Sequence, residues 1–157
     1  MRTHLAFVLA LAACTGSGSS TPEETELAAK RTQFQQAMTG SYQFQWRQSC
    51  ECTQDTTAPM LVTVTNGAIS SAIYIETELP VPAAIRANLD TIEGVFDRIQ
   101  DAIDDNAHMI YVEYDSELGF PKSVAIDYSE QIADEELSLV ISNVEPIVEG
   151  CGVRPCG

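Results

Sequence analysis

The sequence predicts an α+β domain in which an antiparallel β-sheet of about six strands carries two main amphipathic helices packed on one face. Three observations support this fold class. Apolar residues recur at helical spacing in two segments and alternate with polar residues in several shorter ones. The order along the chain is helix, three strands, helix, three strands. Short turns join neighbouring strands, which makes the sheet antiparallel, and its face away from the helices is expected to be partly wet.

The first helix is predicted from residue 21 onward. Residues 21–24 combine a threonine cap, a proline at the first helical position and a glutamate three residues after the cap. Leu27, Phe34 and Met38 follow at helical spacing, and Gly40 ends the run. These signals place one helix at the start of the domain.

The chain then changes to the two-residue period of a strand. From Ser41 to Cys52, the residues fall into two alternating sets, as in a half-buried strand, and one of the two sets is polar throughout. The other set is Tyr42, Phe44, Trp46, Gln48, Cys50 and Cys52. Its aromatic row is expected in the core, because aromatic residues at strand spacing are core far more often than a ligand platform. Two further strands, Met60 to Thr65 and Ala68 to Glu76, flank Asn66-Gly67, the strongest local signal for a hairpin.

A second long helix is predicted after a break at Pro80 and Pro82. Residues 82–89 are expected to form a short helix, and Thr91 then caps the longer one. The longer helix carries one apolar stripe, which consists of Ile92, Val95, Phe96, Ile99, Ala102 and Ile103.

Three strands complete the predicted domain. Met109 to Asp115 and Lys122 to Tyr128 flank a turn that contains Gly119 and Pro121, and the last strand runs from about Leu137 to Val144. We find no internal repeat, so residues 21–144 are expected to form a single α+β domain. Residues 145–157 form a tail that contains two cysteines.

The N-terminal segment is predicted to be a lipoprotein signal peptide. Residues 1–13 have a minimal basic start and an apolar run of nine residues, which would rise only about 14 Å as a helix and cannot span a bilayer. Leu11-Ala12-Ala13-Cys14 resembles a lipobox, so Cys14 is expected to carry the lipid. Residues 14–20 then supply the lipidated cysteine and a flexible tether. The alternative is a plain secretory signal before a chance cysteine.

This segment predicts an exported protein that is anchored to the bacterial cell membrane by lipid. The lipoprotein class that the segment resembles implies the periplasmic face of the outer membrane if the host is Gram-negative, because Thr15 rather than aspartate follows the cysteine. No other stretch is long and apolar enough to span a membrane.

The charge balance limits the partners. Eight Lys and Arg residues stand against 23 Asp and Glu residues, a net charge of -15. Loss of Arg2 with the signal leaves the mature chain at -16. Such a surface repels phosphate backbones and anionic headgroups, which argues against nucleic-acid binding and electrostatic membrane docking. It suits a cationic partner or weak binding of a divalent cation, although solubility is the plainer interpretation.

Several landmarks together resemble a bacterial family known as DUF6174, a domain of unknown function. They are Tyr42-Gln43-Phe44, Cys50-Glu51-Cys52 and the segments 62–67, 91–97, 112–115, 119–121 and 125–127. The resemblance covers roughly residues 42–144 and implies an exported or lipid-anchored domain without a known activity. The tail that holds Cys151 and Cys156 is not part of the pattern.

The four cysteines after Cys14 are expected to form disulfides, because they are even in number and the domain is exported. Three pairings can be drawn. Cys151 and Cys156 can close a tight local loop, which leaves Cys50 to pair with Cys52, an awkward bridge within a flat strand. Alternatively the tail is stapled to the first strand, closing a loop of about 100 residues worth roughly 4–5 kcal/mol. The resemblance, which contains Cys-x-Cys without the tail, favours local pairs.

Two functional alternatives use the same cysteines. A strained bridge between Cys50 and Cys52 would be more easily reduced than a structural one, which suits a thiol redox role. Four thiolates can hold zinc or copper(I), but this spacing is not that of a zinc ribbon, and no metal site or cofactor is predicted.

The remaining polar clusters give weaker signals. Acidic groups at 101–105, 115–117 and 134–136 are expected to be solvated, since the second is only a fragment of a calcium loop. Asp115 and Asp127 flank one turn and are considered as a carboxylate pair, with turn capping as the plainer explanation. His108 is the only histidine after signal removal and has no nucleophile motif beside it.

No catalytic residue is therefore predicted. The sequence favours a lipid-anchored envelope protein whose domain is a non-catalytic binding module, with another envelope protein as its expected partner, bound through the sheet face or the acidic surface. The alternatives are a thiol redox or metal-handling protein centred on Cys50 and Cys52, or a hydrolase that uses Asp115 and Asp127.

Overall fold

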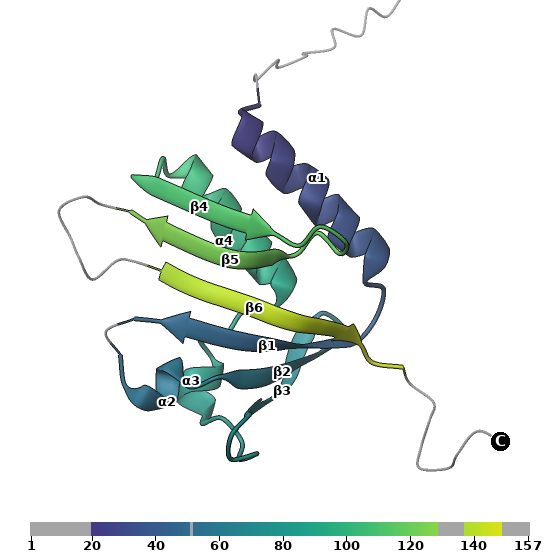
Figure 1. The fold of residues 1–157 in the computed structure, drawn as a ribbon, viewed down its shortest axis with the longest axis vertical. Coiled ribbons are helices and arrows are strands. Elements are labelled where there is room, and N and C mark those ends of the chain that lie inside the picture. The colour runs from purple at the N-terminus through teal and green to yellow at the C-terminus, as the bar shows by residue number, and fades with distance from the viewer. Residues whose placement is uncertain (1–19, 51, 129–136, 149–157) are drawn as a thin grey trace, which may run out of the picture.

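A computed structural model describes residues 20–50, 52–128 and 137–148. Within them, six antiparallel strands form one sheet in the order β3-β2-β1-β6-β5-β4 (Figure 1). The strands are β1 (Tyr42–Ser49), β2 (Met60–Thr65), β3 (Ala68–Tyr74), β4 (Met109–Tyr114), β5 (Pro121–Asp127) and β6 (Leu137–Pro146). The helices are α1 (Pro22–Ala37), α2 (Gln54–Thr57), α3 (Ala83–Arg86) and α4 (Ile92–Asp104). The predicted α+β fold class is confirmed.

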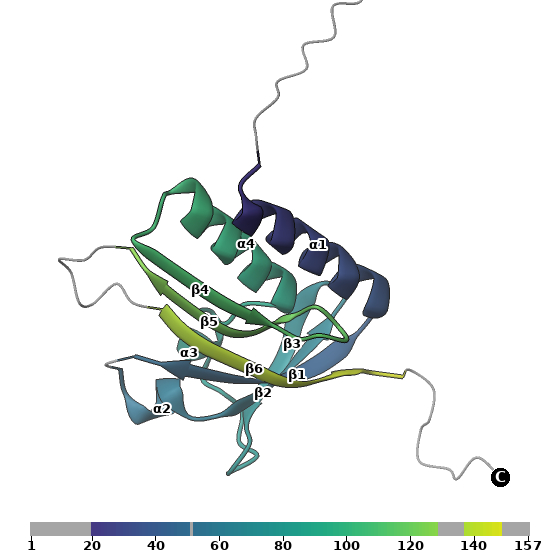
Figure 2. The ribbon, with the colours of Figure 1, turned by 45° about the horizontal axis from the view of Figure 1, so that its top comes forward.

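The two long helices lie side by side on one face of the sheet (Figure 2). At the start of α1, the Thr21 hydroxyl accepts a hydrogen bond from the Glu24 N–H (3.2 Å), and the Glu24 carboxylate accepts one from the Thr21 N–H (2.7 Å). This is the predicted capping box. At the start of α4, the Thr91 hydroxyl accepts from the Gly94 N–H (3.1 Å), as predicted for the cap. No helix in the described part of the chain is long and apolar enough to cross a membrane.

α1 packs against α4 through a small set of contacts. Leu27 and Phe34 are its buried residues, and the Phe34 ring lies 6.2 Å from the ring of Phe96 on α4. Arg31 forms an ion pair with Asp97 (2.7 Å), and its guanidinium lies 5.5 Å from the centre of the Phe96 ring. The guanidinium of Arg31 thus lies at the edge of the apolar contact between the two helices.

β1 and β6 form the centre of the sheet, although they are the first and last strands of the chain. In their register, Trp46 lies opposite Ile141. The flanking pairs are local hairpins. Asn66 and Gly67 both have positive φ (53° and 74°), which fits the predicted tight turn between β2 and β3.

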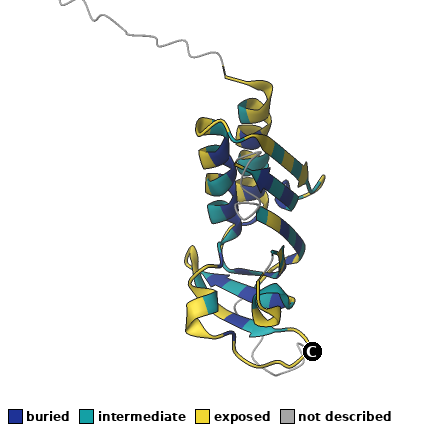
Figure 3. Cartoon of the chain, turned by 90° about the vertical axis from the view of Figure 1, so that its left-hand side faces the viewer, coloured by how far each residue is buried: buried dark blue, intermediate teal, exposed yellow. Residues whose placement is uncertain are grey.

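The core lies between the sheet and the two long helices. Buried residues alternate with more exposed ones along the inner strands (Figure 3). The predicted aromatic row is buried, and it comprises Tyr42, Phe44 and Trp46. The predicted stripe of α4 is buried as well, except that Ile103 is only partly covered. The core is therefore built from the elements whose periodicity the sequence displays most clearly.

The opposite face of the sheet is open to solvent, as expected. Uncharged side chains dominate its centre, and they are Gln43, Gln45, Leu61, Thr63, Ser71, Ile73, Ser123, Ala125, Ser138, Val140 and Ser142. These residues are half-buried or exposed.

The structure corrects several boundaries, and the last strand, expected to end at about Val144, runs to Pro146. The first strand, expected to reach Cys52, ends at Ser49, and the short helix α2 follows it without having been predicted. The segment 82–89 contains only the single turn of α3. The strand expected to reach Glu76 ends at Tyr74.

Candidate functional site

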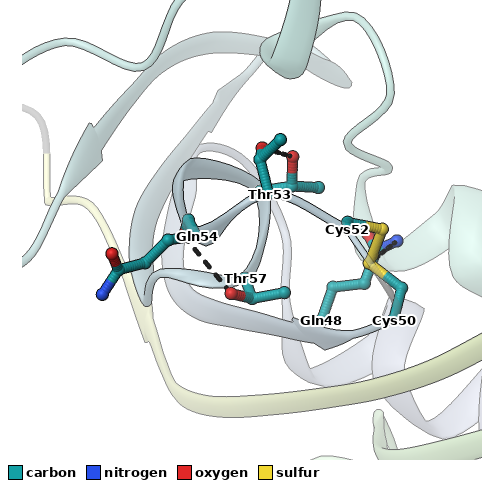
Figure 4. The surroundings of a disulfide bond; sticks show 7 residues. Gln48, Cys50, Cys52, Thr53, Gln54 and Thr57 are labelled. Atoms are coloured by element: carbon teal, nitrogen blue, oxygen red, sulfur yellow. Dashed lines mark hydrogen bonds between the residues drawn. A yellow bond between two sulfur atoms is a disulfide. The ribbon is translucent and has the colours of Figure 1, made fainter.

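Cys50 and Cys52 form a disulfide with each other, with their Cα atoms 5.2 Å apart (Figure 4). The bridge is compatible with the strand because β1 has already ended at Ser49. This is the local pairing that the resemblance favours. Cys151 and Cys156 lie outside the described residues, as do Cys14 and residues 1–19, so their predicted roles stay predictions.

This bridge closes a loop of only three residues. In the chain-entropy model such a loop is worth roughly 1.6 kcal/mol, against about 4–5 kcal/mol for the long loop that a tail staple would have closed. Its contribution to global stability is therefore small. What it does fix is the direction in which the chain leaves β1.

The two sulfur atoms have different surroundings. Cys52 is exposed, whereas Cys50 is half-buried and its Sγ accepts a weak hydrogen bond from Nε2 of Gln48 (3.8 Å) (Figure 4). After Cys52 the chain turns into α2, where the hydroxyls of Thr53 and Thr56 share a hydrogen bond (3.1 Å). The contact from Gln48 thus links the bridge to the end of β1.

A cavity of about 420 Å³ opens beside Cys52, a volume within the range of small-molecule sites. Six parts of the fold meet at it, namely β1, the bridge, α2, α3 with the loop after it, α4 and the start of β6. The lining residues are Trp46, Gln48, Cys52, Thr56, Ile85, Ala87, Asn88, Leu89, Asp90, Arg98 and Leu137. Its wall is part apolar and part amide, with one ion pair.

Trp46 is the most informative residue in this wall. Its side chain is 2% exposed, and its Nε1 is a buried donor without a hydrogen-bond partner among the described residues. Buried donors are almost always satisfied, so an unpaired donor on a residue that lines a cavity is a candidate partner for a ligand acceptor. The chain contains a single tryptophan, which makes this group a unique spectroscopic probe.

Charge in the cavity wall is balanced. Nε and Nη2 of Arg98 both donate to Oδ2 of Asp90, at 3.0 and 2.5 Å. The side chain of Arg98 is 41% exposed, so this pair adds little to stability. Asn88 donates through Nδ2 to the carbonyl oxygen of Ala84 (3.1 Å), which orients its amide. The site thus offers hydrogen-bonding groups without a net charge, in a protein that is strongly acidic overall.

Comparison with known proteins places the chain in a family. Residues 26–146 match the sequence pattern of the family described as "Family of unknown function (DUF6174)". The chain belongs to the DUF6174 family. The match covers most of the chain and confirms the resemblance noted in the sequence. No curated protein and no solved structure matches the chain.

In this DUF6174 chain, the hypothesis that Asp115 and Asp127 form a carboxylate pair is wrong. Met109 lies opposite Asp127, whereas Tyr114 lies opposite Pro121, so Asp115 and Asp127 sit at opposite ends of the β4–β5 ladder. Oδ1 of Asp115 instead accepts from the N–H groups of Glu117 and Leu118 (3.0 and 2.8 Å), which is the turn-capping alternative. No cluster of three or more metal-ligating side chains occurs within the residues the structure describes.

The sequence did not reveal a polar pair at the other end of β1. The hydroxyl of Tyr42 donates to the carboxylate of Glu93 and accepts from the N–H of Ile92 (3.2 Å), so it links β1 to the first turn of α4. Burial and the Glu93 carboxylate raise the pKa of Tyr42. Tyr42 was predicted only as a core residue, because a strand pattern does not indicate which groups the tyrosine hydroxyl will contact.

Proposed function

We propose that this chain is a lipid-anchored binding module of the cell envelope and that its ligand occupies the cavity beside the Cys50–Cys52 bridge. The observation that carries the binding site is that Trp46, whose buried Nε1 has no hydrogen-bond partner among the described residues, lines that cavity. A small movement of the indole that turned Nε1 toward the cavity would let an acceptor on a ligand satisfy this donor.

The character of the wall supports a neutral polar ligand. Amide groups from Gln48 and Asn88 lie beside aliphatic side chains, and Arg98 is neutralised by Asp90. A free anion would also meet the repulsion of a protein with a net charge of -15. We therefore expect a small molecule or a peptide segment that carries carbonyl oxygens.

The anchoring part of the proposal rests on residues 1–20. Expressed in a bacterium, the full chain is expected in the membrane fraction, with a mass that shows a lipid on Cys14. The variant Cys14→Ser is expected in the soluble exported fraction. An unlipidated mature chain that is cleaved elsewhere would contradict anchoring and leave the binding proposal intact.

The binding part is tested by NMR on the mature protein with its bridge intact. The probe is N-acetyl-S-methylcysteine amide, a neutral molecule with two carbonyl groups and no free thiol. We expect a saturable shift of the Trp46 indole N–H signal, with a Kd on the order of 1 mM for so small a ligand. An indole signal that does not move at saturating probe would contradict the site.

A matched pair of variants locates the binding. Ala87, the residue that follows α3, lines the cavity, whereas Ala84 lies within α3 and does not line it, and both are exposed. Ala87→Phe is expected to fill the cavity and weaken probe binding about tenfold or more, whereas Ala84→Phe leaves it unchanged. Equal effects of the two variants would place the ligand elsewhere.

A further inference from the structure

We propose that the Cys50–Cys52 bridge is a thiol–disulfide exchange site, at which a neutral cysteinyl thiol seated in the cavity attacks Sγ of Cys52. This inference rests on the proposed function, because the same cavity holds the thiol. It deepens that function by naming the ligand class and the atom with which it reacts.

Access decides which sulfur reacts. Cys52 is exposed and lines the cavity, whereas Cys50 is half-buried and does not line it. Exchange requires the incoming sulfur to reach the sulfur under attack. A thiol in the cavity therefore meets Cys52 and not Cys50.

The surroundings of Cys50 suit the leaving sulfur. Nε2 of Gln48 already donates to Sγ of Cys50 (3.8 Å), and this hydrogen bond strengthens when the sulfur becomes a thiolate. Gln48 also lines the cavity, so one side chain lies between the ligand site and the leaving group.

The step balances as a single exchange. The thiolate of the incoming cysteinyl group attacks Sγ of Cys52, a new S–S bond forms between them, and the Cys50–Cys52 bond breaks. Both electrons of the broken bond remain on Sγ of Cys50, which leaves as a thiolate and receives, through water, the proton that the incoming thiol released. The products are a mixed disulfide on Cys52 and a thiol at Cys50, and the proton lost by the incoming thiol is the one that Cys50 gains.

The small size of the loop is consistent with this role. Opening the bridge releases only a loop of three residues, while β1 ends at Ser49 and keeps its register with β2 and β6. Exchange can therefore proceed without unfolding the domain.

The test uses the mature protein with its bridge intact and two neutral thiols. N-acetylcysteine amide carries the carbonyl acceptors that the cavity fits, and 2-mercaptoethanol lacks them. Acid-quenched samples are alkylated, and fragment masses locate the mixed disulfide. The oxidised peptide of residues 48–53 serves as the reference. Comparing the rate ratio of the two thiols on the protein with their ratio on this peptide cancels the difference in their intrinsic reactivity.

We expect the mixed disulfide on Cys52 in at least about tenfold excess over Cys50. We also expect the rate ratio of N-acetylcysteine amide to 2-mercaptoethanol to be about fivefold or more higher on the protein than on the peptide. Equal labelling of the two sulfurs, or the same rate ratio on protein and peptide, would overturn the inference.

A pair of glutamine variants tests the leaving group. Gln48→Met removes the donor to Cys50 and is expected to slow exchange with both thiols severalfold, on the order of threefold to tenfold. Gln45→Met alters the same strand on the open face and is expected to have no effect. Equal slowing by both variants would contradict the role of Gln48.

The S-methyl probe separates the two proposals, since it binds without reacting. If it shifts the indole signal while exchange is unselective, the exchange inference falls and the binding function stands. If it does not bind, the proposed function falls, and any remaining exchange reflects exposure of the bridge alone.

Discussion

At the scale of single residues, one hydroxyl ties the centre of the sheet to the start of a helix. Tyr42 is 2% exposed, and its hydroxyl contacts both the Glu93 carboxylate and the Ile92 N–H. It thereby satisfies one of the free N–H groups at the beginning of α4. Its ring also packs edge-on against Phe34 at 5.7 Å, which brings α1 into the same contact.

Replacing Tyr42 by phenylalanine should destabilise the protein by about 1–3 kcal/mol, because a buried N–H loses its acceptor while the ring packing is kept. Urea unfolding monitored by circular dichroism measures this difference. Tyr111→Phe is the control, since Tyr111 is 54% exposed and its loss should cost less than about 0.5 kcal/mol. Equal costs would mean that the hydroxyl of Tyr42 has no structural role.

The same variant has a pH signature. The pKa of Tyr42 is raised by burial and by Glu93, whereas an unfolded tyrosine ionises near 10. Above pH 10 the unfolded state therefore loses its proton first, and the stability of the wild type falls as pH rises, by up to about 1.4 kcal/mol per pH unit. The difference in unfolding free energy between wild type and Tyr42→Phe should therefore narrow between pH 9 and about 11. A constant difference would argue against the raised pKa.

At the scale of elements, the turn between β4 and β5 anchors α1. Nε2 of Gln33 donates to the carbonyl oxygens of Ser116 and Glu117, at 3.1 and 2.9 Å. Gly119 has φ +82°, and a Cβ there would lie 2.8 Å from the backbone oxygen of Lys30. Glycine is thus required twice at this position, by its dihedral angle and by the close approach of the helix.

Gly119→Ala should therefore cost more than Gly67→Ala in the other hairpin. Gly67 also has positive φ (74°), but a Cβ there meets no atom within 4 Å. We expect Gly67→Ala to lower the free energy of unfolding by about 1 kcal/mol, from backbone strain alone. Gly119→Ala should lower it by about 2 kcal/mol more, because α1 must shift. Equal unfolding free energies of the two variants would show that a Cβ at residue 119 causes no steric clash with α1.

These elements also show how far the sequence predicts the structure. Helices with a cap and an apolar stripe, and hairpins with Asn-Gly, were found because their signals are local. The four residues of α2 were missed, since Gln-Asp-Thr-Thr has no apolar period and buries no side chain. The pairing of β1 with β6 has no local signal at all, because the partners are about 100 residues apart.

The candidate site was predictable only in part. The Cys-x-Cys spacing drew attention to residues 50 and 52, and the aromatic row placed Trp46 in the core. The cavity between them needs Asn88, Asp90 and Arg98, which lie after α3 and on α4. Only the tertiary fold brings these segments to the end of β1, so no pattern within one element indicates the cavity.

At the scale of the whole molecule, the last strand holds the sheet together. β6 lies between β1 and β5, so within the sheet the hairpin β2–β3 with β1 is joined to the hairpin β4–β5 through β6 (Figure 1). It also contributes Leu139, Ile141 and Val144 to the core. Folding of the sheet must therefore wait for the end of the chain, which closes a long loop at an entropic cost.

A chain that ends at residue 136 should consequently fail to fold. It loses a central strand and three buried aliphatic side chains, each worth about 1.5–3 kcal/mol on burial, which is comparable to the 5–15 kcal/mol that stabilise an ordinary domain. We expect no near-ultraviolet circular dichroism from Trp46 and no cooperative urea transition. A chain that ends at residue 148 keeps β6 and is expected to unfold cooperatively, within about 1 kcal/mol of the full chain. A cooperative transition in the shorter chain would show that one half of the sheet folds alone with its helices, and β6 would then be an addition to a preformed domain.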